Sequence, residues 1–217
     1  FVLVFISLSV ATYQRNGIWK DNVTLWGDVV RKAPMSDRGH TNLGLAYYDK
    51  GHHERAFEEY LTAIQINPKF SEAQYNLGIL YMEKELTEKA IQSFQIALKY
   101  QPKLYQVHNN LGLAYLQKGL VAEAVKEFQV ALEIRPHTEA YMNLGTIYTL
   151  QGKTEEAIKA YKAAMGLSPN ILEAHYNLGL IYRDRDQTPL AKEHLRKVLE
   201  LQPDFNAARQ VLESLPE

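Results

Sequence analysis

Five asparagines recur along the chain at positions suited to binding another polypeptide. They stand 34, 34, 33 and 34 residues apart, each directly before a Leu-Gly pair: Asn42, Asn76, Asn110, Asn143 and Asn177. A carboxamide carries two N–H donors and an acceptor oxygen, so it can pair with the N–H and C=O groups of an extended peptide of any sequence. Asparagine is a mediocre helix former, so helix propensity does not explain the repetition. We therefore predict that these asparagines bind peptide backbone, and we call them the asparagine ladder.

Acidic residues recur at fixed distances from the ladder. Among the ten positions that lie four before or seven after each asparagine, six are acidic: Glu72, Glu139, Glu173, Asp49, Glu83 and Asp184. Only Arg38 is basic. The first five of these acidic residues complete the candidate peptide-binding site. Charge complementarity then favours a neutral or basic extended segment as the partner.

Other residues that could do chemistry are better explained by packing or solvation. Three of the seven histidines precede a Leu-Gly pair by three residues, at His40, His108 and His175, where they should pack in the core. His52 and His53 are predicted to lie in a solvated turn, and no third ligand stands at metal-binding spacing. The chain has no cysteine, phosphate-binding glycine loop or nucleophile motif. We predict no catalytic residue, metal or cofactor, and thus no enzyme within these residues.

The elements that position the ladder follow from a repeat of about 34 residues. Tyrosine follows each Leu-Gly glycine by three residues, at Tyr47, Tyr81, Tyr115, Tyr148 and Tyr182. Alanine comes nine residues later, at Ala56, Ala90, Ala124, Ala157 and Ala191. Prolines keep the same interval, at Pro34, Pro68, Pro102, Pro136, Pro169 and Pro203. Apolar residues at i, i+3, i+4 and i+7 around each Leu-Gly predict a first helix, and the proline ends a second one.

Glycine within a predicted helix needs a physical reason. It costs about 1 kcal/mol relative to alanine in a helix interior. Five glycines in register therefore predict that a larger residue would clash with the neighbouring helix. Glycine or a polar residue at Gly51, Glu85, Gly119, Gly152 and Asp186 marks the turn within each pair.

This register resembles the tetratricopeptide (TPR) repeat family. The resemblance implies an all-α fold, a right-handed α-α superhelix of antiparallel helix pairs that serves as a protein-binding scaffold. In that family the first helices line a concave groove, which is where the ladder would lie. The repeats are similar to those of O-GlcNAc transferase, in which asparagines at this position hold a substrate polypeptide by its backbone. The alternative is that the asparagines hydrogen-bond across neighbouring repeats.

The repeat spacing also predicts the organisation of the whole chain. Five TPR repeats are expected at residues 37–70, 71–104, 105–137, 138–171 and 172–205. Residues 17–36 should hold the second helix of an incomplete repeat, Asn22 to Lys32, and residues 1–16 its first helix. Residues 206–217 keep Ala208, Val211 and Leu212 on one side, which predicts the capping helix that an open solenoid needs.

The N-terminal run from Phe1 to Ala11 is almost wholly apolar. It is shorter than the roughly 20 residues that span a bilayer, so we predict that 1–16 is the end of a transmembrane helix and that the protein is membrane-anchored through it. The runs YQRN, WKD and TLW within residues 13–26 resemble the junction in membrane O-mannosyltransferase-like proteins with C-terminal TPR arrays. That resemblance implies the lumen or periplasm, whereas the nearby basic residues favour the cytoplasmic side.

Charge and composition limit the partners. With 24 basic and 25 acidic residues the formal net charge is −1, too little excess for nucleic acid binding. Three functions remain open. The first is a scaffold that binds extended protein segments in its concave groove. The second is an assembly scaffold that uses its convex face or ends, with self-association included. The third is the substrate-recognition part of a membrane glycosyltransferase whose catalytic part lies elsewhere.

Overall fold

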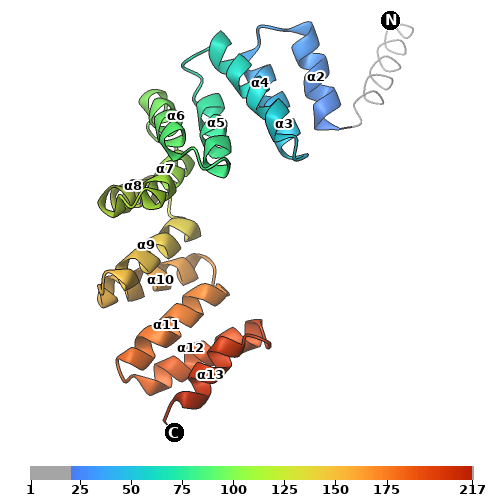
Figure 1. Ribbon diagram of the computed structural model, residues 1–217. Helices are drawn as coiled ribbons and strands as arrows, with labels where there is room; N and C mark the ends of the chain where they lie inside the picture. Colours follow the sequence, from blue (N-terminus) through green and yellow to red (C-terminus); the bar gives the residue numbers. More distant parts are fainter. Residues whose placement is uncertain (1–20, 217) are drawn as a thin grey trace, which may run out of the picture. The chain divides into compact units, whose positions relative to one another are not determined.

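The computed structural model describes residues 21–216, and all regular secondary structure in that range is α-helical (Figure 1). The chain divides into two compact units, with the division between Ala114 and Tyr115. The helices before the division are α2 (Asn22–Lys32), α3 (Asp37–Tyr48), α4 (His53–Ile66), α5 (Ser71–Glu83) and α6 (Thr87–Tyr100). The division falls within α7 (Tyr105–Gln117). The helices after it are α8 (Val121–Ile134), α9 (Thr138–Leu150), α10 (Thr154–Leu167), α11 (Leu172–Asp184), α12 (Thr188–Leu201) and α13 (Asn206–Ser214).

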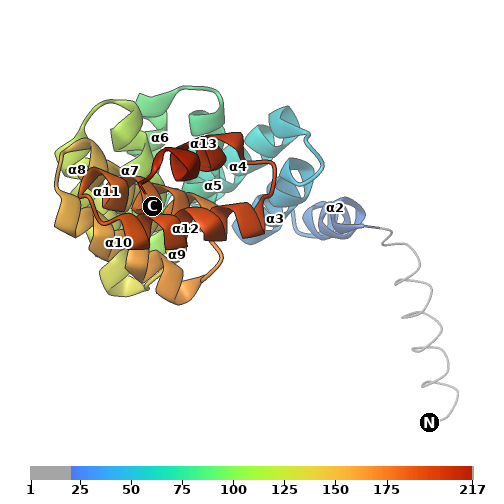
Figure 2. The same ribbon diagram turned by 90° about the horizontal axis from the view of Figure 1, so that it is seen from below.

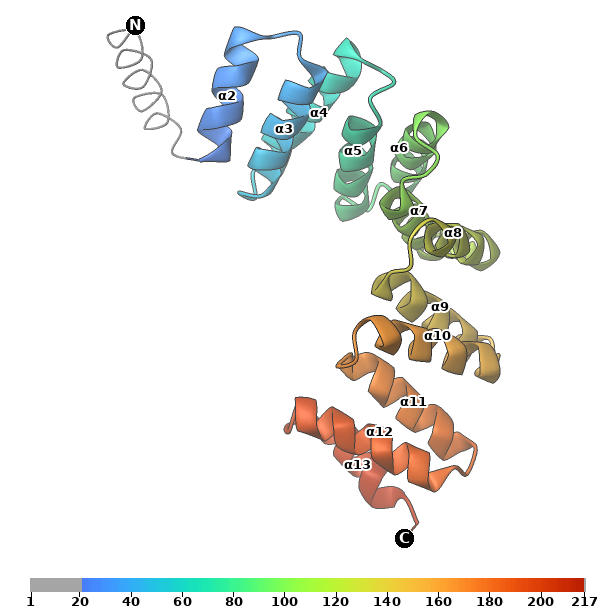
Figure 3. The same ribbon diagram turned by 180° about the vertical axis from the view of Figure 1, so that it is seen from behind.

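Consecutive helices pack as antiparallel pairs. In the first unit these are α3 with α4 and α5 with α6, and α4 packs in turn on α5. In the second unit they are α9 with α10 and α11 with α12, and α10 packs on α11. The terminal helices follow the same arrangement, since α2 lies along α3 (Figures 1 and 3) and α13 lies against α12 (Figures 1 and 2).

The helical glycines make the close packing within each pair possible. A Cβ atom added at Gly44 would lie 2.6 Å from Cε1 of Tyr60, and one added at Gly78 would lie 2.4 Å from Cε1 of Phe94. Such distances do not occur between real atoms without displacement. The predicted clash is thus confirmed at Gly44 and Gly78, because each of these glycines receives the large side chain of the second helix.

The turn within each pair is closed in the same way five times. The residue at the turn has a left-handed backbone, with φ of 75° at Gly51 and 57° at Glu85. This conformation is what lets the chain reverse after the first helix. In the first pair the next residue, His52, then donates its N–H to the carbonyl of Tyr47 at 2.9 Å. The equivalent bonds join Leu86 to Tyr81, Leu120 to Tyr115, Lys153 to Tyr148 and Gln187 to Tyr182.

Both ends of the described chain are structured by local contacts. Helix α2 covers the range Asn22–Lys32 that the proline spacing predicts, and it begins with a capping box. In that box the Asp21 carboxylate accepts from the Thr24 N–H at 2.9 Å, while the Asp21 N–H donates to the Thr24 hydroxyl. At the other end, Ala208 of α13 is buried in a cluster with Leu195 and Val198 of α12.

The predicted membrane anchoring is wrong. Within residues 21–216, none of the helices is long and apolar enough to cross a bilayer. The longest of them have 14 residues, whereas a span needs about 20. The apolar run of residues 1–16, on which the prediction rested, lies outside the described residues.

Candidate functional site

The first helices of three successive repeats enclose a pocket in the first unit. It has a volume of about 300 Å³ and lies among α3, α5 and α7. Its lining residues are Thr41, Asn42, Leu45, Glu72, Tyr75, Asn76, Leu104, Gln106 and Val107. The apolar part of this α3–α5–α7 pocket includes Leu45, whose side chain remains 42% exposed, beside the fully buried Val107. A large aliphatic surface left open beside amide and carboxylate groups is typical of a binding site.

Two asparagines of the ladder lie at this pocket. Asn42 comes from α3 and Asn76 from α5, and both are partly exposed. Within the described chain, neither side-chain amide hydrogen-bonds to another protein group. The same holds for Asn143 on α9. These three amides therefore keep all of their donors and their acceptor available.

The other two ladder asparagines are already hydrogen-bonded. Nδ2 of Asn110 donates to the hydroxyl of Tyr75 at 3.0 Å, and Nδ2 of Asn177 donates to the hydroxyl of Tyr161 at 3.1 Å. Both bonds join one repeat to the preceding one. Burial raises the pKa of Tyr75, although the bond from Asn110 opposes that rise. The phenol is therefore neutral and can accept this bond.

A sequence signal distinguishes Asn110 from the other asparagines. Its partner Tyr75 is the residue directly before the preceding asparagine of the ladder. The residues at the equivalent place for Asn76, Asn143 and Asn177 are Thr41, Asn109 and Met142. Only a tyrosine has a hydroxyl on a side chain long enough to reach the next repeat. The residue type before each asparagine could therefore have identified this bond.

The acidic residues of the candidate site do not all lie together. Glu72 is exposed at the α3–α5–α7 pocket. Glu83, at the end of α5, instead accepts a hydrogen bond from the Tyr48 hydroxyl and lies 2.9 Å from Nδ1 of His53. The hydrogen bond to Glu83 raises the pKa of Tyr48 to about 12. Asp49 directly follows the last residue of α3. Glu139 and Glu173 lie exposed in the first turns of α9 and α11 in the second unit.

Sequence reasoning missed most of the pocket's apolar lining. Leu45 follows Asn42 by three residues and so lies on the same side of α3. Leu104 directly precedes α7, and Val107 lies in its first turn. Leu45 and Val107 each lie three residues from a ladder asparagine, Asn42 and Asn110, and this spacing was a usable sequence signal.

The histidines are more than packing residues. His40 and His175 are buried as predicted, yet each has two polar partners. His53 contacts Glu83 and the Tyr48 ring rather than lying in a solvated turn. Within residues 21–216, no cluster of three or more His, Asp or Glu side chains is arranged to hold a metal ion.

Comparison with known families identifies the repeat. Models of the TPR repeat match residues 44–85 and 145–184, and models of the tetratricopeptide repeat match residues 75–138 and 172–205. Together they cover well over half of the chain. The chain belongs to the tetratricopeptide repeat family. Its fold class is therefore the all-α TPR α-α superhelix, and proteins with this fold are typically protein–protein interaction scaffolds.

Solved TPR structures resemble the chain over most of its length. Pseudomonas aeruginosa PilF matches with a TM-score of 0.79 at 18% identity, over 95% of this chain and 94% of PilF. YrrB, described as a TPR protein with an unusual peptide-binding site, matches with a TM-score of 0.71 at 23% identity, over 87% of this chain and 97% of YrrB. MamA from Desulfovibrio magneticus RS-1 matches with a TM-score of 0.68 at 23% identity, over 78% of this chain and 97% of the MamA chain.

These likenesses establish the fold alone. No curated protein sequence matches the chain significantly. The predicted similarity of the repeats to O-GlcNAc transferase, and of the N-terminal junction to membrane O-mannosyltransferase-like proteins, receives no support from the matches.

Proposed function

We propose that this TPR protein binds extended, neutral to basic segments of other proteins at the α3–α5–α7 pocket. The observation that carries the proposal is the pair of amides of Asn42 and Asn76, which have no hydrogen-bond partner in the described chain and lie beside an open apolar surface. Polar groups left unsatisfied on a partly buried surface gain most when a ligand pairs with them.

The chemistry of the pocket gives each group a role. The amides of Asn42 and Asn76 donate to peptide carbonyls and accept from peptide N–H groups, so they hold the backbone without reading its sequence. An apolar side chain of the peptide packs on Leu45 and Leu104. The exposed carboxylate of Glu72 favours a basic residue nearby.

The remaining predicted site residues divide between contact and support. In the second unit, Asn143 would bind peptide backbone, and Glu139 and Glu173 would attract a basic segment. Asn110 and Asn177 each spend one N–H on a tyrosine of the preceding repeat, so each can offer a peptide only its remaining N–H and its oxygen. Glu83 is engaged with Tyr48 and His53, so its part is to join two repeats. YrrB, as a TPR protein described with a peptide-binding site, supports the class of ligand.

An array of 12-residue peptides that vary in charge and apolar content tests the proposal. Wild-type protein should select peptides with one large apolar residue and a net charge of zero or above. Replacing both Asn42 and Asn76 by alanine should weaken the selected peptides about tenfold, because each lost hydrogen bond is worth roughly 0.5–1.5 kcal/mol. A matched control is Gln92→Ala, since Gln92 is an exposed amide on α6 and not part of this pocket.

The alternative of an assembly scaffold makes the opposite prediction. If the convex face or the ends bind folded partners or other copies of the chain, replacing all five ladder asparagines by alanine leaves binding intact. Selection of acidic peptides would likewise count against the proposal. No observation in residues 21–216 favours the third predicted function, substrate recognition for a membrane glycosyltransferase, and it is not part of the proposal.

A further inference from the structure

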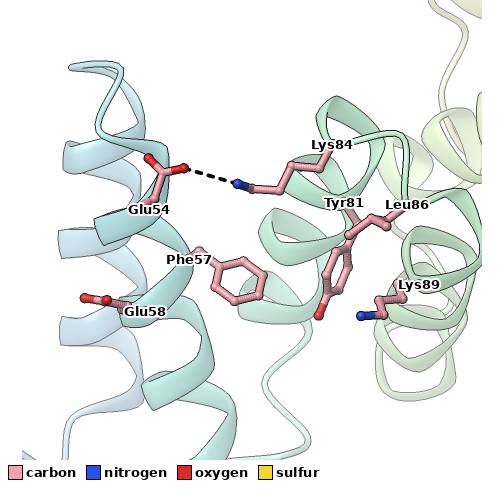
Figure 4. A pocket seen from close by; sticks show the side chains of 7 residues that line it. All are labelled: Glu54, Phe57, Glu58, Tyr81, Lys84, Leu86 and Lys89. Carbon is pink, nitrogen blue, oxygen red and sulfur yellow. Dashed lines mark hydrogen bonds and ion pairs between the residues drawn. The ribbon is translucent and has the colours of Figure 1, made fainter.

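The first unit has a second groove, which is lined by residues of α4, α5 and α6. It encloses about 260 Å³ between α4 and the turn from α5 into α6 (Figure 4). Its lining residues are Glu54, Phe57, Glu58, Tyr81, Lys84, Leu86 and Lys89. None of them lines the first pocket. We call this the α4–α6 groove.

The floor of the groove is apolar and held in place from below. The rings of Phe57 and Tyr81 meet edge to face, with centroids 5.7 Å apart and planes at 77°. Both rings pack on a buried cluster that includes Tyr60 and Leu80. Leu86 adds an aliphatic side chain that is 41% exposed. The groove thus offers an ordered surface for an aromatic or branched apolar side chain.

The two walls carry opposite charges. Figure 4 shows Glu54 and Glu58 on the α4 side, with Lys84 and Lys89 on the other side. Nζ of Lys84 lies 3.2 Å from Oε1 of Glu54, so these two neutralise each other across one end of the groove. Glu58 and Lys89 make no ion pair within the described chain, and Nζ of Lys89 lies over the Tyr81 ring at 5.7 Å. The other end therefore presents an acid and a base on opposite walls.

We propose that the α4–α6 groove binds an amphipathic helix of a partner protein. An aromatic or branched apolar residue of that helix packs on Phe57 and Tyr81, a basic residue pairs with Glu58, and an acidic residue pairs with Lys89. A helix suits this geometry because residues three and four after the apolar one emerge on its two flanks. The apolar side chain supplies the affinity, and the flanking charges supply the selectivity.

The charge pattern is not a general property of the repeat. At the corresponding positions of the second unit, Glu155 and Arg185 keep the ion pair of Glu54 with Lys84. The place of Glu58 is taken by Lys159, and that of Lys89 by Leu190. The second unit therefore cannot pair with both an acid and a base in the same way. This makes Lys159 a suitable control position.

Three labelled helical peptides test the proposal against the full chain. Each is a capped alanine-based helix with one phenylalanine, and the residues three and four after it are Arg and Glu, Arg and Arg, or Glu and Glu. Binding is measured by fluorescence anisotropy. Wild-type protein should bind the Arg/Glu peptide about threefold or more tightly than either other peptide, as expected for one exposed ion pair. Glu58→Lys should shift the preference to Glu/Glu, and Lys89→Glu should shift it to Arg/Arg.

Other results would overturn the proposal. Equal affinity for all three peptides, or a preference that neither substitution changes, would show that the charged walls select nothing. Loss of binding in the Asn42→Ala, Asn76→Ala double variant would place the peptides in the α3–α5–α7 pocket instead. Self-association of the chain that Glu58→Lys abolishes would make a second copy the occupant. Lys159→Glu should leave the order of the peptides unchanged, and a change there would move the site to the second unit.

Discussion

The helix pairs α3/α4 and α11/α12 are built in the same register but are joined by different chemistry. In both, the histidine three residues before Leu-Gly has its Nε2 atom 3.0 Å from a proline carbonyl, Pro34 for His40 and Pro169 for His175. The second ring nitrogen meets different groups. Nδ1 of His40 lies 2.6 Å from a carboxylate oxygen of Glu59, and Nδ1 of His175 lies 2.9 Å from Nδ1 of His194.

This difference decides where the protons can be. Both nitrogens of His40 face oxygen acceptors, so an imidazolium ring satisfies both contacts and pairs with Glu59. Nε2–H of His175 donates to the Pro169 carbonyl. In a neutral His175 ring, Nδ1 therefore accepts a hydrogen bond from Nδ1–H of His194. The same repeat position therefore faces a carboxylate in the first unit and a second imidazole in the second unit.

The environment of His194 favours the neutral form. Burial lowers the pKa of His194 below its ordinary value of 6.5, and the neighbouring His175 lowers it further. Lys162 adds to this effect, whereas Glu193 opposes it. The His194 ring also stacks on Tyr182, with centroids 5.5 Å apart. A charge on His194 thus lacks the carboxylate partner that His40 has.

The packing beneath the two histidines differs as well. A Cβ added at Gly44 would meet the Tyr60 ring at 2.6 Å and the Ala56 carbonyl at 3.2 Å, so neither neighbour can yield easily. One added at Gly179 would meet only Leu195, with its Cγ at 2.9 Å, so the approach there is less close than at Gly44. The α3/α4 pair is therefore the less tolerant of the two.

Alanine at these two glycines should give the largest difference. Gly44→Ala should destabilise the α3/α4 pair by up to about 2 kcal/mol, because overpacking costs about 1–3 kcal/mol and the gain in helix propensity offsets about 1. Gly179→Ala should change the α11/α12 pair by less than about 1 kcal/mol. Hydrogen exchange measured by mass spectrometry on peptides from each pair reports the two effects separately.

Gly166→Ala is the matched control, since no atom lies within 4 Å of a Cβ added there. It should stabilise α10 by about 1 kcal/mol through helix propensity alone. Equal losses for Gly44→Ala and Gly179→Ala would show that the packing contrast between the pairs has no energetic consequence.

Lowering the pH should destabilise the α11/α12 pair more than the α3/α4 pair. The folded-state pKa of His194 lies below 6.5. As the pH falls below 6.5, His194 is therefore protonated in the unfolded chain before it is protonated in the folded chain. The stability from the His175–His194 contact is thus fully present above pH 6.5 and is lost progressively as the pH falls toward the folded-state pKa. Hydrogen exchange at pH 7.5 and 5.5, corrected for intrinsic rates, should show α11/α12 losing more stability than α3/α4, by at most about 1.4 kcal/mol, which is the limit for one proton over one pH unit.

Exchanging the partners of the two histidines, Glu59 and His194, should exchange the acid sensitivity of the two helix pairs. His194→Glu gives His175 the carboxylate that His40 has, so it should remove the acid sensitivity of α11/α12. Glu59→His builds two facing imidazoles in α3/α4 and should create that sensitivity there. If both variants keep the wild-type pH dependence, the histidine contacts do not control it.

The sequence predicted the helix pairs well because the forces behind them are local and periodic. The Leu-Gly register placed the helices and the close contacts at Gly44 and Gly78, and the proline interval placed α2. It did not predict which asparagines are free. The bond from Asn110 to Tyr75 spans 35 residues and depends on how far one side chain reaches across a repeat interface. The apolar side of the pocket likewise combines side chains from different parts of the chain, since Leu45 lies on α3 and Leu104 directly before α7.

The turns of the two pairs differ in the residue that holds the left-handed conformation. Gly51 in the α3/α4 turn has a φ of 75°, whereas the equivalent residue of α11/α12, Asp186, holds a φ of 56°. A left-handed conformation costs most residues about 1–2 kcal/mol, and aspartate tolerates it better than most. Gly51→Ala should therefore cost the first pair about 1 kcal/mol, whereas Asp186→Gly should stabilise the second by about 0.5 kcal/mol. Thermal unfolding followed by circular dichroism should show opposite shifts in Tm, and a loss of stability in Asp186→Gly would mean that the aspartate side chain itself holds the turn.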